Sequence, residues 1–142
     1  MTEVNPGDPL WEDVVIHGGR LPDFNSIKAN GLTCGGPLGK RNAIFAATTQ
    51  AGCRADASMY LYINAKRSHQ GGARWFISGQ GAWQTTGIKD TRTIPWKYVD
   101  RAVDVNGEEI FDSSKVPVMH GRSNEEGVGI TSFELPISTA KT

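Results

Sequence analysis

The residues best suited to chemistry lie in separate short patches between His17 and Tyr98. The first patch is His17-Gly18-Gly19, a later one contains Arg54, and a glycine-rich stretch holds Ser78 and Gln80. A histidine can donate or accept a hydrogen bond near neutral pH, and a guanidinium can hold a phosphate through two parallel hydrogen bonds. If the fold brings these groups together, they could bind a phosphate-bearing ligand.

The distribution of charge supports the same class of ligand. The chain carries 15 basic and 15 acidic residues, yet the stretch from Lys40 to Arg74 has six basic residues and Asp56 as its one acid. A neutral chain with a basic middle suits a phosphorylated ligand better than an extended duplex, because duplex-binding domains are usually strongly basic. A solvated surface with salt bridges is the competing explanation.

Length and composition predict one globular domain. A chain of 142 residues can bury a core without disulfides or metals, and no apolar run approaches the ~20 residues that span a membrane. The N-terminal residues carry acids and prolines in place of a signal peptide, so we expect a cytoplasmic protein without membrane partners. Cys34 and Cys53 match no metal spacing, so we expect free thiols and no metal site.

Short strands and helices are expected along most of the chain. Hydrophobic patterns predict strands at 14–17, 43–47, 59–63, 75–77, 82–85, 102–105 and 108–111, helices at 23–30 and 50–57, and a helical turn at 95–99. Gly31 ends the first helix, and Asn106-Gly107 predicts a hairpin turn. The result is an α+β domain at 14–111, preceded by an N-terminal extension at 1–13. The tail at 112–142 could wrap the domain, pair with an edge strand or be mobile.

Taken in order, the patches resemble the C-terminal, NAD-binding lobe of the RNA 2′-phosphotransferases, which remove a splice-junction 2′-phosphate from tRNA. The family pattern runs H-G-T, I-x-x-x-G-L, R-x-H-I-H-x-A, G-x-R, F-x-x-S-x-N-x-V-x-L-T-x-G and I-P-x-x-Y. The corresponding stretches here are His17-Gly18-Gly19, Ile27 to Leu32, Arg41 to Ala47, Gly52-Cys53-Arg54, Trp75 to Gly87, and Ile94 to Tyr98. Each motif is short, so the specificity of the resemblance lies in their shared order.

This resemblance implies an ADP-ribosyltransferase-like fold, in which two small packed antiparallel or mixed sheets with short helices enclose a cleft for NAD. It implies that His17 hydrogen-bonds the NAD ribose, while the backbone at Gly18 and Gly19 binds the nicotinamide carboxamide. Two further residues, Ser78 and Gln80, would line the nicotinamide-ribose pocket. Arg54 would hold a phosphate and act with His17 in catalysis.

Each of these residues also has an ordinary structural explanation. A histidine that ends a strand is usually a satisfied structural group, and Arg54 could be a surface charge or a helix cap. Ser78 and Gln80 could simply be turn residues, since they lie near a glycine-rich bend. The sequence alone leaves these alternatives open.

The sequence departs from the family pattern in ways that bear on the substrate. Ala43-Ile44-Phe45 replaces H-I-H, Gly19 replaces threonine, and Gln80 replaces asparagine. We also expect the N-terminal lobe that grips the RNA 2′-phosphate in this family to be absent. We therefore expect an NAD-dependent transferase that moves ADP-ribose onto a phosphate of RNA or of a small molecule. The alternative is an inactive domain of this fold with a structural or protein-interaction role in a larger protein or assembly.

Overall fold

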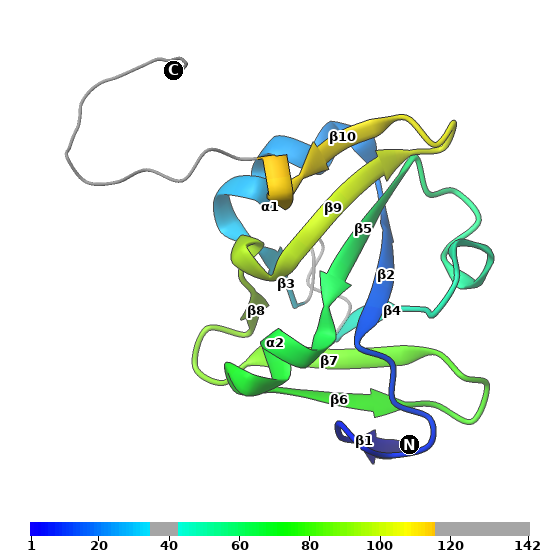
Figure 1. Cartoon of the computed structure of the whole chain (residues 1–142), viewed down its shortest axis with the longest axis vertical. Helices are drawn as coiled ribbons and strands as arrows, with labels where there is room; N and C mark the ends of the chain where they lie inside the picture. Colours follow the sequence, from blue (N-terminus) through cyan, green and yellow to red (C-terminus); the bar gives the residue numbers. More distant parts are fainter. Residues whose placement is uncertain (35–42, 116–142) are drawn as a thin grey trace, which may run out of the picture.

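A computed structural model describes residues 1–34 and 43–115 of the chain. In this part of the chain, two antiparallel sheets pack around a shared hydrophobic core, and two short helices lie beside them (Figure 1). The expected α+β class with two small sheets is confirmed.

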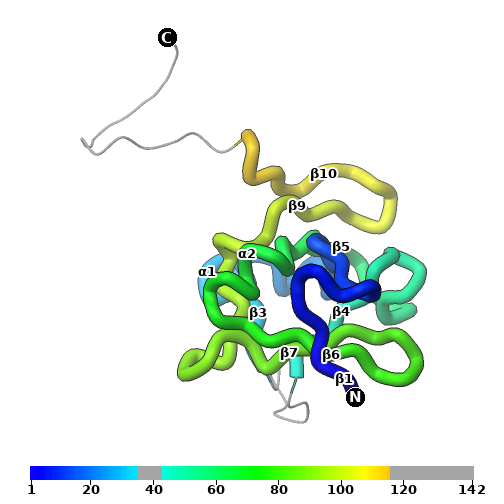
Figure 2. The backbone as a smooth tube through the Cα atoms, turned by 60° about the horizontal axis from the view of Figure 1, so that its bottom comes forward, coloured from blue at the N-terminus to red at the C-terminus, as the bar shows by residue number. Residues whose placement is uncertain are grey.

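The larger sheet has six strands within the described residues. Its order is β1 (Thr2–Val4), β6 (Ala73–Ile77), β7 (Trp83–Ile88), β8 (Thr93–Ile94) and β3 (Leu32–Thr33), and β4 (Ile44–Ala46) also pairs with β7. The N-terminal strand β1 lies beside β6 at the outer edge of this sheet (Figure 2). All of its pairings are antiparallel.

The smaller sheet carries the histidine patch on its edge strand. Its order is β10 (Glu109–Asp112), β9 (Val99–Asp104), β5 (Met59–Asn64) and β2 (Val14–Gly19). The helices are α1 (Phe24–Asn30) and α2 (Ala65–Gln70), and 3₁₀ turns lie at Leu21–Asp23, Gln50–Gly52, Trp96–Tyr98 and Ser113–Lys115.

The core forms between the inner faces of the two sheets. Alternation along β5 turns Met59, Leu61 and Ile63 inward, where all three are fully buried. The larger sheet contributes Trp75 and Trp83, whose ring centroids are 5.9 Å apart. Burial of a large apolar side chain contributes roughly 1.5–3 kcal/mol, so these residues fix how the sheets sit against each other.

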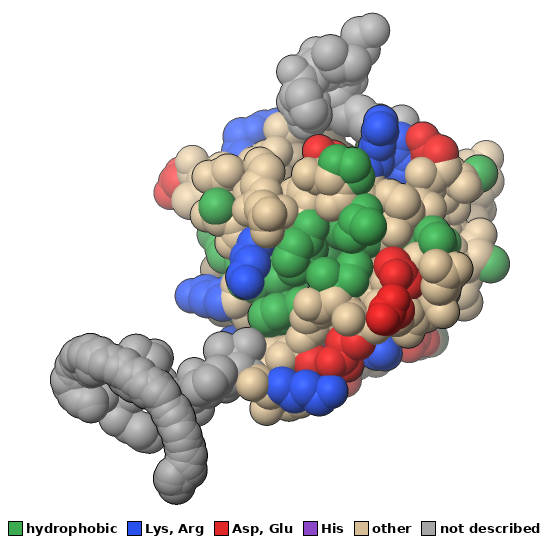
Figure 3. All heavy atoms as spheres, turned by 90° about the horizontal axis from the view of Figure 1, so that it is seen from above, with side chains coloured by type: hydrophobic (Ala, Val, Ile, Leu, Met, Phe, Trp, Pro, Cys, Tyr) green, Lys and Arg blue, Asp and Glu red, His purple; other side chains and the backbone are tan. Residues whose placement is uncertain are grey.

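A cluster of Phe24, Trp96 and Phe111 packs α1 against the smaller sheet. Phe24 packs edge-on against Trp96 at 5.6 Å, and Trp96 lies 4.8 Å from Phe111 of β10, measured between ring centroids. The face that carries α1 and β10 shows hydrophobic side chains gathered at its centre (Figure 3). The helix then ends where Gly31 takes a positive φ of 79° and donates its N–H to the carbonyl of Ile27 at 2.7 Å, as expected.

Most of the expected strands are confirmed, with shifted ends. β2 does not stop at His17 but continues through the two glycines, because Gly18 pairs with Tyr60 and Gly19 with Met59. We expected the first residue of this strand, Val14, to be buried, but it is 41% exposed and lies outside the core. The hairpin expected around Asn106-Gly107 is β9–β10, and the 3₁₀ turn Trp96–Tyr98 matches the expected turn at 95–99.

The helix expected at 50–57 is wrong. Only the 3₁₀ turn Gln50–Gly52 forms there, capped by the Thr49 side chain, which accepts the Gly52 N–H at 3.1 Å. Beyond it the Cys53 thiol donates to the carbonyl of Ile16 at 3.4 Å. The segment is therefore held against β2, and this tertiary contact overrides the local preference for helix.

The structure also contains elements that the sequence analysis did not predict, namely β1, β3, β8 and α2. Residues 1–13, expected as an extension, contribute β1 to the larger sheet, and Val4 is buried in the core. Predictions for the tail beyond Lys115, and for Lys40 and Arg41 of the basic middle, lie outside the described residues.

Candidate functional site

The candidate site lies where β2 meets β4, so it lies at the junction of the two sheets. Ile16 and Ala47 form an antiparallel bridge there, with N–H to carbonyl distances of 2.7 and 2.8 Å. One residue further along β2, the Nδ1 atom of His17 lies 2.7 Å from the carbonyl oxygen of Phe45 in β4. A carbonyl can only accept, so Nδ1 carries the hydrogen and Nε2 of the neutral ring is an acceptor.

Its surroundings keep the imidazole of His17 neutral. Burial lowers the pKa of this side chain below its ordinary value, the bond to the Phe45 carbonyl opposes that effect, and the positive charge of Arg54 lowers the pKa further. On the Nε2 side the neighbour is Gly19, where an added Cβ would lie 3.8 Å from this nitrogen. The same Cβ would lie 3.1 Å from the terminal methyl carbon of Met59, so packing accounts for the missing side chain at Gly19. The Nε2 atom is an acceptor that could receive a hydroxyl group.

Gly18 lies buried on the edge strand β2, beneath residues 53–57. The N–H and carbonyl of Ile16 both point away from β5 toward Ala47, and residues two apart in a strand point the same way. The polar groups of Gly18 therefore also face away from β5. Its N–H is directed at the thiol of Cys53, and a Cβ at this position would lie 2.8 Å from the Cβ of Cys53 and 3.1 Å from that of Ala57.

Arg54 lies next to Gly18, and its guanidinium already has a partner. The Arg54 Cγ atom would be 3.4 Å from a Cβ added at Gly18. Its Nε and Nη2 atoms donate to the two carboxylate oxygens of Asp56 at 2.5 and 2.9 Å. This pair raises the pKa of Arg54 and lowers the pKa of Asp56. The arginine thus stands beside the histidine patch as an exposed ion pair.

Ser78 and Gln80 lie in the turn between β6 and β7. The Ser78 hydroxyl accepts the N–H groups of Gln80 at 3.3 Å and of Ala82 at 3.2 Å, while the Ser78 N–H donates to the Ala82 carbonyl at 2.9 Å. The turn adjoins Trp83, which pairs with Ala46 at the β2–β4 junction. No hydrogen bond within the described residues links either side chain to His17 or Arg54. Their place in a nicotinamide-ribose pocket stays a prediction.

Comparison with known proteins finds a distant relative whose name describes an enzyme activity. The chain is 28% identical over 118 residues to a protein of Schizosaccharomyces pombe named "Putative tRNA 2′-phosphotransferase". No protein-family profile matches the chain. The similarity covers 78% of this chain and 30% of the relative, so the chain spans less than a third of that protein's length.

This similarity indicates a distant relationship to a protein named as a tRNA 2′-phosphotransferase. It agrees with the resemblance found from His17 to Tyr98, since both rest on most of the described chain. The assignment of NAD, of a phosphate acceptor and of individual site residues goes further than this similarity reaches.

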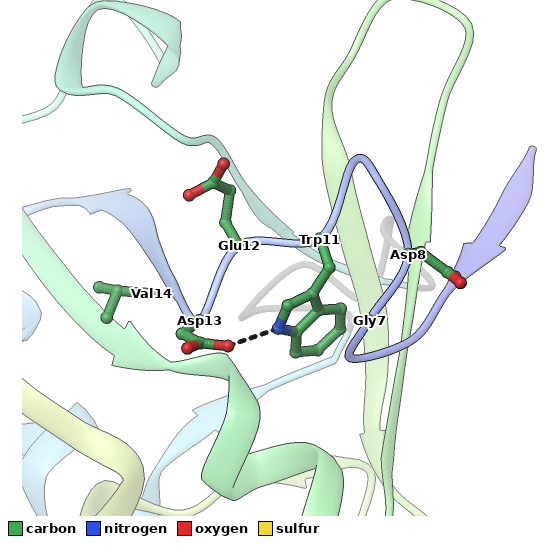
Figure 4. Close-up of a pocket in the computed structure, with 6 residues that line it drawn as sticks. All are labelled: Gly7, Asp8, Trp11, Glu12, Asp13 and Val14. Atoms are coloured by element: carbon green, nitrogen blue, oxygen red, sulfur yellow. Dashed lines mark hydrogen bonds between the residues drawn. The ribbon is translucent and has the colours of Figure 1, made fainter.

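A hollow lies at the opposite end of β2 from the histidine patch, and the sequence analysis did not predict it. It has a volume of about 470 Å³ and is lined by Gly7, Asp8, Trp11, Glu12, Asp13 and Val14 (Figure 4). The indole Nε1 of Trp11 donates to Asp13 at 2.7 Å. Three carboxylates would repel a phosphate, so this hollow does not suit the ligand expected at the histidine patch. In the sequence, the acidic residues among the first thirteen positions are the feature that could have indicated this hollow.

Residues 1–34 and 43–115 hold neither a metal-ligand cluster nor a membrane-spanning helix. No three His, Cys, Asp or Glu side chains lie close enough together there to hold a metal ion. No helix in the same residues is long and apolar enough to cross a membrane. Both cysteines in this part of the chain are free thiols and half-buried.

Proposed function

We propose that this domain has an ADP-ribosyltransferase-like fold and transfers ADP-ribose from NAD onto a phosphate of RNA or of a small molecule. The observation that carries the proposal is the grouping of His17, Gly18 and Arg54 at one end of β2. Sequence similarity to a protein named as a tRNA 2′-phosphotransferase adds support from an independent direction.

The residues present fit NAD by their chemistry, because the neutral imidazole of His17 supplies an acceptor and Arg54 supplies a guanidinium beside Gly18. When bound, NAD supplies an ADP-ribosyl group on a leaving group that departs with its electron pair. The Nε2 atom of His17 would accept a hydrogen bond from a ribose hydroxyl and so orient the sugar. The carbonyl of Gly18, which faces away from β5, would accept an amide N–H. Arg54 would balance phosphate charge.

A phosphate acceptor also explains how the site could work without a catalytic carboxylate. A phosphate monoester is already anionic at neutral pH, with a second pKa near 6, so no base has to remove a proton before it attacks. The acid that contacts Arg54 is Asp56, and both of its carboxylate oxygens accept hydrogen bonds from that arginine. Under this proposal the chain's contribution is to position the two reactants and to compensate charge.

The experiment is a calorimetric titration of NAD and of ADP-ribose into the wild type, His17→Ala and a matched control, His69→Ala. His69 is a half-buried histidine whose Nε2 lies 3.1 Å from the amide oxygen of Asn5, and it lies outside the site. We expect micromolar binding to the wild type and to His69→Ala, and its loss in His17→Ala. Release of nicotinamide when phosphorylated RNA is added would then identify the acceptor class.

An inactive domain with a binding or structural role is the second candidate. It is favoured by the Arg54–Asp56 pair, which occupies the guanidinium, and by Phe45, which stands in the part of the pattern where the family has a histidine. Failure of the folded wild type to bind either NAD or ADP-ribose would reject the enzyme and favour this candidate.

A further inference from the structure

Asp56 engages Arg54 with both carboxylate oxygens. The two hydrogen bonds run from Nε and Nη2 of the arginine, at 2.5 and 2.9 Å, and they use the Nε–Nη2 edge of the guanidinium. A phosphate binds arginine through the same kind of paired N–H groups. A phosphate that takes the same pair of donors would compete with Asp56, whereas a phosphate on the Nη1–Nη2 edge would share the arginine with it.

We propose that Asp56 is a positioning residue that sets how strongly Arg54 binds a phosphate in this site. This inference rests on the proposed function and deepens it. In the ligand-free protein Asp56 holds the guanidinium beside β2, and an entering phosphate displaces the carboxylate or shares the arginine with it. The negative charge of Asp56 thus weakens anion binding while it keeps Arg54 in place.

The surroundings distinguish this pair from an ordinary surface ion pair. Arg54 packs against Gly18, and its charge influences His17, so its guanidinium belongs to the candidate site. Two other charges act on the pair more weakly: Asp23 raises the pKa of Arg54, and Arg20 lowers the pKa of Asp56. Asp56 is the carboxylate that contacts the guanidinium directly.

Exposure makes the pair easy to open. The side chains of Arg54 and Asp56 are 51% and 66% exposed, and exposed ion pairs are worth a few tenths to about 1 kcal/mol. Removing the competing carboxylate should therefore tighten phosphate binding by about 1.5-fold to about 5-fold. A change of this size is measurable and leaves the fold intact.

The chain offers a matched control in a second exposed pair. Arg74 donates to Glu3 from Nε at 2.9 Å and from Nη2 at 2.7 Å, and this pair joins β6 to β1 outside the site. Glu3→Gln removes the same unit of charge and the same type of bond as Asp56→Asn. It therefore separates a local effect from a change in net charge.

The test titrates ADP-ribose and inorganic pyrophosphate into the wild type, Asp56→Asn, Asp56→Glu, Glu3→Gln and the double variant Asp56→Asn with Arg54→Gln. We expect tighter binding of ADP-ribose to Asp56→Asn, near wild-type binding to Asp56→Glu and Glu3→Gln, and no gain in the double variant. Conservative rescue by glutamate is the result that a merely structural role of Asp56 would not require.

The outcomes separate this inference from the proposed function. If the wild type binds ADP-ribose and Asp56→Asn binds it no more tightly, the role of Asp56 is overturned and the function stands. If no variant binds ADP-ribose, the proposed function is rejected. The pyrophosphate titration then tests by itself whether Asp56 competes with a phosphate for Arg54. Tighter pyrophosphate binding in Asp56→Asn that depends on Arg54 supports the competition, and its absence overturns it.

Discussion

His17 and Phe45 join the two sheets through a hydrogen bond from the Nδ1–H of the imidazole to the main-chain carbonyl, at 2.7 Å. The bond stands beside the Ile16–Ala47 bridge, so the side chain contributes to the same junction as the backbone. It also fixes which ring nitrogen is left as an acceptor. The side chain that joins the two sheets is thus the one that we propose binds a ribose hydroxyl.

Acid should weaken the fold through His17. Its pKa is lowered in the folded protein, first by burial, so the unfolded chain binds the proton more readily. Stability is complete above the unfolded pKa, near 6.5, and falls as the pH drops below it toward the folded pKa. Urea unfolding at pH 7.5 and pH 5 measures this loss. His17→Asn keeps a donor for the Phe45 carbonyl without titrating, so it should lose less stability; an equal loss would contradict the assignment.

A methyl group at Gly18 should destabilise the protein. The new Cβ would lie 2.8 Å from the Cβ of Cys53 and 3.1 Å from that of Ala57, distances that force the segment away from β2. Overpacking of this kind costs about 1–3 kcal/mol, which thermal or urea unfolding can measure. Gly79→Ala is the control because nothing lies within 4 Å of its added Cβ. Cys53→Gly should restore part of the loss in Gly18→Ala.

The sequence predicted the sheets better than it predicted the short elements. The β-branched and aromatic content of 59–63 identified β5, and in the structure every second side chain of this strand is buried. The helix α2 was missed because AKRSHQ lacks a clear apolar face, and its start depends on Asn64, whose side chain accepts the Arg67 N–H at 2.9 Å. The strand β1 is only three residues long and exists through its pairing with β6, which no local pattern reveals.

The candidate site could be predicted only in part for a similar reason. His17 and Gly18 are adjacent in the sequence, but their nearness to Arg54 depends on how residues 53–57 fold back against β2. The spacing of these residues along the chain does not determine that contact; the family resemblance supplied it. Asp56 was visible as the one acid in the basic middle of the chain, and that signal should have identified it as the partner of Arg54.

Ser68 should stabilise the core through its hydroxyl. Its Oγ accepts the indole N–H of Trp75 at 3.0 Å and donates to the carbonyl of Ala65 at 2.8 Å, and both Ser68 and Trp75 are fully buried. Ser68→Ala would leave the indole donor without this acceptor, at a cost of about 1–3 kcal/mol in unfolding free energy. The exposed Ser114→Ala should cost less. Adding Trp75→Phe to Ser68→Ala should cost less than the two single losses summed; additivity would count against the bond.

Cys53 should react slowly with iodoacetamide while the protein is folded. Burial raises the pKa of its thiol, with partial opposition from the Gly18 N–H, and only the thiolate is nucleophilic. Cys34→Ser leaves Cys53 as the one thiol to follow by mass spectrometry. We expect labelling at pH 7.5 to be at least about tenfold slower than in urea, because unfolding both exposes the thiol and restores its ordinary pKa. Equal rates would mean that residues 53–57 do not stay packed against β2.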